Sequence, residues 1–346
     1  SAVRPGGAAW RAGMHTGDDI VAIGGKPVSA FEDLQKGISL GDVAGGVEVT
    51  LRRPDDVGGG ERTVTLHPDT DIGVPTVGIS GPSSLRVAPG ASRKAVGSAA
   101  TADPPLEPGD VIEGVDGEPV ASFARLVERL AERTDRPVRL AVRRGAAAGK
   151  DGERLEVVLA PLPRLGLGLA TGTGAVKAVQ AGSPAEAAGI RAGDRLVSID
   201  GAAIDDPFLL DDRLRAAAGR SVTVVVERAG VEEAISVTPR AVGWIDESPM
   251  RATPLSVSSL GLALPLDATV AAVTAGGPAA AAGIAPGDRI TGLRFVLPGE
   301  ATADDDWLEL SDADPNWAVA MTILQSQPTG TKVVVKIDGA AGAREV

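Results

Sequence analysis

One turn and the strand that follows it occur four times in this chain, and this repetition constrains the fold more than any other feature. The third copy reads "GIRAGDRLVSIDG", and its Gly193-Asp194 pair recurs at Gly17-Asp18, Gly109-Asp110 and Gly287-Asp288. Successive pairs lie about 85 to 95 residues apart, which is too long for a solenoid repeat and fits a small domain. The 346 residues therefore predict four small domains in tandem.

The third repeat shows the internal order most clearly. An alternating strand at 175–179 precedes "GSPAEAAG", where Ser183 is placed to cap a short helix. Gly193 is expected to take a positive φ in the turn before a strand at 195–199. An amphipathic helix at 206–219 places Leu210 and Leu214 on one face, and a hairpin turns at Ala229-Gly230. The other repeats match this order in part, which favours true repetition over generic alternation of helices and strands.

The predicted fold class is a strand-rich α+β fold of four tandem domains. Each domain is expected to be a small partial barrel or sandwich of five to six strands with two helices. The predicted boundaries are 1–73, 74–162, 163–241 and 254–346. The first domain lacks its opening loop and part of its first strand, and the fourth carries an acidic insertion near 298–315.

Composition excludes several functional classes. A net charge of −12 argues against a nucleic-acid partner, because such a surface needs a basic patch. The absence of Cys excludes thiolate metal sites and Cys nucleophiles. No apolar run is long enough to span a membrane, so direct membrane insertion by this chain is not expected.

The sequence has no catalytic or metal-binding motif that we recognise. Only His15 and His67 are present, no H-E-x-x-H occurs, and we expect both histidines to be structural surface residues. The acidic insertion lacks the spacing and the Gly of an EF-hand, so a solvated loop is favoured over a Ca²⁺ site. We therefore expect neither an enzyme nor a cofactor site in this chain.

The combination of "GSPAxxAG", "IxxGDxIxxIDG", an amphipathic helix and a "VxVxVxRxG" hairpin resembles bacterial PDZ domains, and the strand order resembles their circularly permuted form. The resemblance implies binding of protein substrates or peptide C-termini by strand addition. It implies peptide-binding residues in two Gly-containing loops and one helix: Leu165, Gly166, Leu167, Gly168, Leu260, Gly261, Leu262, Leu210 and Leu214. The third repeat is expected to combine the loop at 165–168 with the helix at 206–217, and "TVGIS" at 76–80 is the equivalent loop of the second repeat.

Tandem domains of this kind resemble the extracytoplasmic region of site-2 proteases, which are membrane-embedded zinc metalloproteases. This resemblance implies a periplasmic fragment that recruits or filters substrates for a membrane protease domain, with zinc held only in a catalytic part that this chain lacks. Two alternatives stay open: a tandem scaffold or adaptor without a protease, and the PDZ region of an HtrA-type serine protease.

Overall fold

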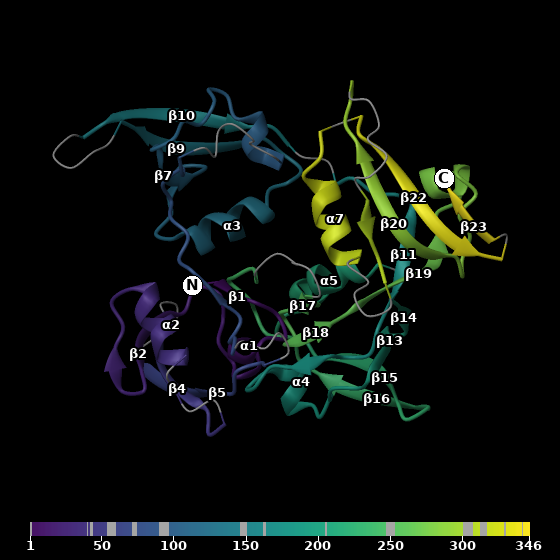
Figure 1. Cartoon of the computed structure of the whole chain (residues 1–346), viewed down its shortest axis with the longest axis horizontal. Coiled ribbons are helices and arrows are strands. Elements are labelled where there is room, and N and C mark those ends of the chain that lie inside the picture. Colours follow the sequence, from purple (N-terminus) through teal and green to yellow (C-terminus); the bar gives the residue numbers. More distant parts are fainter. Residues whose placement is uncertain are drawn as a thin grey trace.

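The computed structural model shows a strand-rich α+β chain whose four sequence repeats lie at the corners of a quadrilateral (Figure 1). Repeats 1 and 2 occupy the left of that view, and repeats 3 and 4 the right. The structure describes residues 2–39, 41, 44–53, 60–70, 75–89, 97–145, 151–161, 164–204, 206–246, 253–299, 307–311, 317–328, 330–340 and 342–346. Most of the acidic insertion therefore lies outside the described residues.

The first three repeats each contain a four-stranded antiparallel sheet of the same order. The order is β5-β4-β2-β3 in repeat 1, β10-β9-β7-β8 in repeat 2 and β16-β15-β13-β14 in repeat 3. The bounds are β2 Asp19–Ile23, β3 Lys26–Pro27, β4 Val47–Arg52, β5 Glu61–Leu66, β7 Val111–Val115, β8 Glu118–Pro119, β9 Val138–Arg144, β10 Glu153–Leu159, β13 Arg195–Ile199, β14 Ala202–Ala203, β15 Val222–Arg228 and β16 Val231–Val237.

Repeat 4 contributes to a larger sheet of order β11-β19-β20-β22-β23, with β21 paired to β20. The bounds are β11 Leu169–Thr173, β19 Leu266–Val273, β20 Arg289–Val296, β21 Leu308–Glu309, β22 Lys332–Gly339 and β23 Gly342–Glu345. Of the acidic insertion, β21 is the strand that the structure describes.

Helices of two kinds accompany these sheets. The short ones are α1 Ala8–Arg11, η2 Gly97–Thr101, α4 Pro184–Ala187, η3 Pro207–Leu209 and α6 Pro278–Ala281. The longer ones are α2 Phe31–Ser39, α3 Phe123–Ala131, α5 Leu210–Ala216 and α7 Trp317–Gln325. The Ser183 hydroxyl accepts a bond from the Glu186 N–H and caps α4, as the sequence predicts. No helix of the described chain is both long and apolar enough to cross a membrane.

The Asp of each repeated Gly-Asp pair is buried and hydrogen-bonded. Gly193 has φ 93°, as predicted, and its equivalents Gly17, Gly109 and Gly287 have φ between 91° and 96°. Asp194 is 1% exposed; its carboxylate accepts from the Arg191 N–H at 2.8 Å and from two Arg228 nitrogens at 2.7 Å. Asp18, Asp110 and Asp288 bind in the same way, each with one backbone N–H three residues earlier and one Arg. The motif therefore ties the turn to the hairpin.

Three short strands complete neighbouring repeats across the sequence boundaries. In repeat 3, β12 (Ala178–Val179) pairs with β18 (Leu262–Leu264), while β11 pairs with β19 of repeat 4. In repeat 1, β1 (Ala2–Val3) pairs with β6 (Ile79–Ser80). Repeats 3 and 4 thus exchange equivalent segments, and the "TVGIS" segment packs with repeat 1 rather than repeat 2.

One backbone hydrogen bond fixes each of these segments in the same place. The N–H of the second residue of each short helix donates to the carbonyl of the residue before the Gly: Ala9 to Val77, Ala185 to Leu260 and Ala279 to Leu167, at 2.9 to 3.0 Å. The hydrophobic cores agree with this, because Val77 belongs to the core of repeat 1, and Leu260 and Leu262 belong to that of repeat 3. Leu167 and Leu169 pack against the core of repeat 4.

The segment 240–246 joins three repeats. Arg215 of α5 donates to the carbonyls of Val242 and Trp244, and Arg125 of α3 donates to the carbonyl of Gly243. The His15 ring of repeat 1 stacks on Trp244 with 3.8 Å between ring centroids. His15 is 7% exposed, so its expected surface position is wrong, whereas His67 is exposed. Trp244, far away in the sequence, is what buries it.

Candidate functional site

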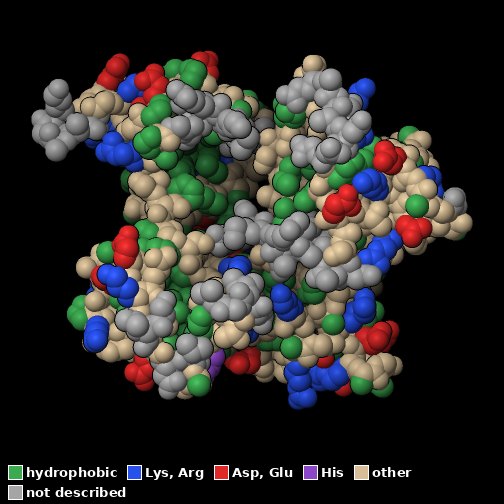
Figure 2. Space-filling model, viewed as in Figure 1, with side chains coloured by type: hydrophobic (Ala, Val, Ile, Leu, Met, Phe, Trp, Pro, Cys, Tyr) green, Lys and Arg blue, Asp and Glu red, His purple; other side chains and the backbone are tan. Residues whose placement is uncertain are grey.

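An open groove lies in repeat 4, where the loop 164–168 and β11 face α7 and η3. Its cavity has a volume of about 440 Å³. It is lined by Arg164, Leu165, Gly166, Leu167, Gly168, Leu169, Ala170, Thr171, Asp206, Pro207, Phe208, Leu209, Ala272, Val273, Thr274, Trp317 and Met321. Figure 2 shows a hollow between the regions that hold α3 and α7 in Figure 1; it is distinct from this groove, because none of the residues that line the groove belongs to α3.

The edge of the sheet forms one side of this groove. β11 is the outermost strand of its sheet, because β19 pairs with one of its edges and no described strand pairs with the other. An unpaired strand edge presents backbone N–H and C=O groups that another extended chain can bind. The groove therefore has a backbone surface for strand addition.

The loop before β11 presents backbone donors. Gln325 of α7 holds this loop by accepting from the Leu165 N–H at 3.0 Å and donating to its carbonyl at 2.7 Å. In the described part of the chain, no hydrogen bond uses the N–H of Gly166, Leu167 or Gly168 as donor. Gly168 has φ 71°, and successive N–H groups in such a turn form a site for an anion.

Apolar side chains form the opposite walls. Trp317 and Met321 lie one helical turn apart on α7, and Trp317 is 2% exposed in the core of repeat 4. Phe208 from η3 of repeat 3 packs against that core, and its neighbour Leu209 is 41% exposed. The groove is therefore built from both repeats, as expected where two repeats exchange strands.

Two polar groups add chemistry to the groove. Thr171 is 2% exposed, and its Oγ1 has no hydrogen-bond partner within the described structure. A buried hydroxyl without a partner costs free energy, and a ligand that bonds to it recovers that cost. At the other end, an Arg164 Nη2 lies 3.7 Å from the Asp206 carboxylate.

The equivalent groove of repeat 3 is filled by the chain itself. β17 (Leu255–Val257) pairs with β18 at the edge where a peptide would add. The Val257 carbonyl accepts from the N–H groups of Leu260 and Gly261 at 3.1 and 2.8 Å, which occupies the donors of this loop. Leu260 and Leu262 are completely buried. The N–H groups of Leu260 and Gly261 are therefore not free to bind an external carboxylate.

The structure brings together only part of the predicted groove of repeat 3: the loop lies beside Asp206, Pro207, Phe208 and Leu209, at the start of the predicted helix at 206–217, but not beside Leu210 and Leu214. The loop at Leu165, Gly166, Leu167 and Gly168 faces α7 of repeat 4, whereas Leu210 and Leu214 on α5 are 1% exposed in the core that contains Leu260 and Leu262. The physical reason is that both loops contain Leu-Gly-Leu, so the local sequence does not distinguish which core each loop fills. Sequence reasoning also missed the walls of the groove that Trp317 and Met321 form.

Across the residues that the structure describes, no group of three or more His, Asp or Glu side chains is placed to hold a metal ion. Burial and the nearby positive charges of Arg53, Arg240 and Arg62 lower the pKa of His15 to about 2, so its ring is neutral at ordinary pH. Its stacking on Trp244 gives it a structural role.

The family model of the PDZ domain matches two regions of this chain, residues 1–53 and 175–228. Both regions end at an Arg that binds the Asp of a Gly-Asp pair, Arg53 and Arg228, so they cover equivalent parts of repeats 1 and 3. PDZ domains are protein- and peptide-binding modules and are typically not catalytic. These two regions therefore indicate a protein- or peptide-binding function.

Proposed function

We propose that this chain binds the C-termini of proteins or peptides in the groove of repeat 4, by adding the peptide as a strand to β11. The observation that carries the proposal is the contrast between two loops of the same sequence. The N–H groups of Leu260 and Gly261 bond to the Val257 carbonyl, whereas those of Gly166, Leu167 and Gly168 bond to no acceptor in the described chain. A terminal carboxylate is the anion that three successive N–H groups suit.

The geometry gives the ligand three contacts. Its carboxylate binds the loop, its backbone pairs with β11, and an apolar terminal side chain packs against Trp317 and Met321. A polar side chain earlier in the peptide can bond to Thr171 Oγ1. No cofactor enters this mode of binding.

The biological setting that we propose is the recruitment or steric filtering of substrates for a membrane-embedded zinc protease of the site-2 type, on the extracytoplasmic side of the membrane. Its support is the sequence alone: the tandem repeats resemble the permuted PDZ regions of such proteases and carry no catalytic motif. The sequence that flanks these residues tests it. Membrane spans with H-E-x-x-H support it, a trypsin-like domain supports a serine protease, and neither supports a scaffold.

Peptide binding is tested by fluorescence anisotropy with labelled hexapeptides that end in Val or Leu and are added to the full chain. We expect dissociation constants of roughly 10–100 μM, because the interface is small and strand addition orders a flexible peptide. An amidated C-terminus should weaken binding about tenfold or more, since it removes the charge that the loop recognises.

Two substitutions at one position give a matched pair. Gly166→Pro removes one N–H donor and should weaken binding, whereas Gly166→Ala retains that donor. A Cβ at this position meets no atom within 4 Å, so the Ala variant should fold and bind like the parent. Equal binding by both variants, or by free and amidated peptides, would refute the groove as a carboxylate site.

A further inference from the structure

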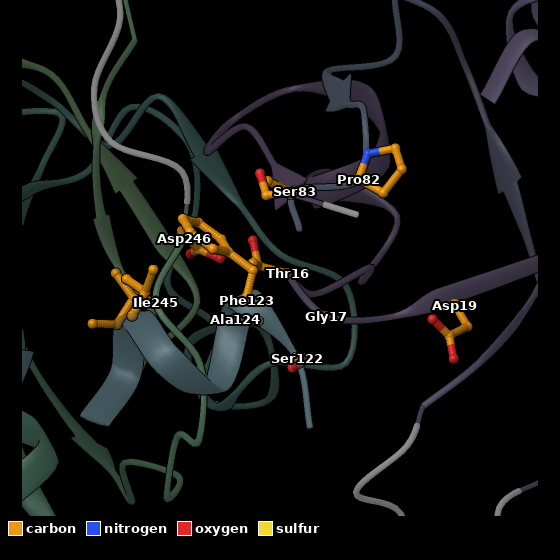
Figure 3. A pocket seen from close by; sticks show the side chains of 12 residues that line it. Thr16, Gly17, Asp19, Pro82, Ser83, Ser122, Phe123, Ala124, Ile245 and Asp246 are labelled. Atoms are coloured by element: carbon orange, nitrogen blue, oxygen red, sulfur yellow. The ribbon is translucent and has the colours of Figure 1, made fainter. Parts of the chain in front are cut away.

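A second cavity, separate from the groove of repeat 4, lies between repeats 1 and 2. Its volume is about 440 Å³ (Figure 3). Four parts of the chain meet there: residues 2–19 of repeat 1, residues 82–83, the start of α3 with Ser122 before it, and the segment 240–246. It is lined by Ala2, Thr16, Gly17, Asp19, Pro82, Ser83, Ser122, Phe123, Ala124, Val127, Ile245 and Asp246.

Asp246 is the unusual residue of this cavity. It is only 9% exposed, and Oδ2 accepts from the Trp10 Nε1–H at 3.3 Å and from the hydroxyls of Ser256 and Ser258. Its other oxygen, Oδ1, has no hydrogen-bond partner in the described structure. In Figure 3 the side chain stands between Ile245 and Thr16 on the cavity wall. A buried carboxylate with one unused oxygen is costly unless a donor or a cation reaches it.

The charge of the lining indicates which partner fits. Asp19 and Asp246 are its ionisable residues, and none of the residues that line the cavity in the described chain is Lys or Arg. Burial raises the pKa of Asp246, although it interacts electrostatically with Arg240, which does not line the cavity. A cationic ligand would reverse this effect by favouring the charged carboxylate.

The remaining surface of the cavity suits an apolar body. Phe123, at the start of α3, is 39% exposed although it is a large aromatic residue. Ala124, Val127 and Ile245 line the cavity beside it. Apolar walls with one or two convergent polar groups are typical of small-molecule sites.

We propose that this cavity binds a small organic cation, with an ammonium or amidinium group at Asp246 and an apolar body against Phe123 and Val127. The inference does not rest on the peptide groove, because no residue lines both cavities. The positive charge of the ligand would compensate the Asp246 carboxylate, whose Oδ1 has no donor in the described structure.

The test is a titration of the isotope-labelled full chain with 2-phenylethylammonium, followed by NMR, with 2-phenylethanol as a neutral analogue of the same shape. We expect shifts at Phe123, Val127 and Ile245 with the cation, and binding of the alcohol at least roughly tenfold weaker. Asp246→Asn should weaken binding of the cation roughly 10- to 100-fold, since it removes the charge while its amide oxygen can still accept from Trp10.

Two further variants make the result decisive. Phe123→Ala changes an exposed side chain and should lower the affinity without unfolding the protein. Asp212→Asn removes the same charge from an exposed position on α5 that does not line the cavity, and should leave binding unchanged. Equal affinity for the alcohol, no binding of the cation, or equal effects of Asp246→Asn and Asp212→Asn would overturn the proposal.

Discussion

Replacing Gly261 by Ala should destabilise repeat 3, although Gly261 lies on the sequence segment that leads into repeat 4. A Cβ at this position would stand 2.3 Å from the Cβ of Ser183, which caps α4 of repeat 3. Gly261 also has φ 77°, which costs an L-residue roughly 1–2 kcal/mol. Relief of the clash needs a backbone shift and adds roughly 1–3 kcal/mol. We expect a total loss of about 2–5 kcal/mol in the free energy of unfolding of repeat 3.

Hydrogen exchange measured by NMR locates this loss along the chain. Protection should fall in β13 and β15 of repeat 3, and change less in β20 and β22 of repeat 4. Gly182→Ala is the matched control, because Gly182 has φ 69° and a Cβ there meets nothing within 4 Å. The control variant should lose only the cost of a positive φ for an L-residue, about 1–2 kcal/mol in the free energy of unfolding. Equal losses for both variants, or a loss confined to repeat 4, would refute the exchange of strands between the repeats.

Two further predictions concern buried ionisable groups. Asp194→Ala should cost repeat 3 about 2–4 kcal/mol in urea denaturation, because it leaves the Arg228 guanidinium without its partner. The hydrogen bonds from Arg228 lower the pKa of Asp194. This stabilisation is therefore present above the usual pKa of 3.8 and is lost as the pH falls through the lowered value. An equal loss of unfolding free energy in acid for the parent and the variant would contradict this. Burial lowers the pKa of His15 from 6.5 to about 2, so repeat 1 should lose about 1.4 kcal/mol for each pH unit below 6.5. His15→Phe, which keeps a ring to stack on Trp244, should remove that slope, and an unchanged slope would show that another group titrates.

The local features of this chain could be predicted because each depends on neighbours in sequence. Gly193 has its positive φ, Ser183 caps its helix, and the hairpin turns at Ala229-Gly230, where both residues have positive φ. These features follow from backbone sterics and short-range hydrogen bonds, which a few adjacent residues determine.

The site could be predicted only in its parts. The sequence predicts the loop at Leu165–Gly168 as a binding loop, but it does not predict that α7 of repeat 4 lies beside this loop together with η3 of repeat 3. Two loops with the same Leu-Gly-Leu sequence do not encode which core they complete, and this depends on the path of the whole chain. Burial of His15 by Trp244 was missed for the same reason, since the two residues meet only in the folded structure.

The most direct test of the proposed function is to map where a peptide binds. The full chain, labelled with nitrogen-15, is titrated with a pool of peptides that have free apolar C-termini. We expect shifts at Gly166–Thr173 and along α7, with smaller shifts at η3, and no shifts at α5 or β18. Shifts confined to residues 210–216 and 260–264 would place binding in repeat 3 and contradict the account, and no shifts at millimolar peptide would show that this chain does not bind peptides in its grooves.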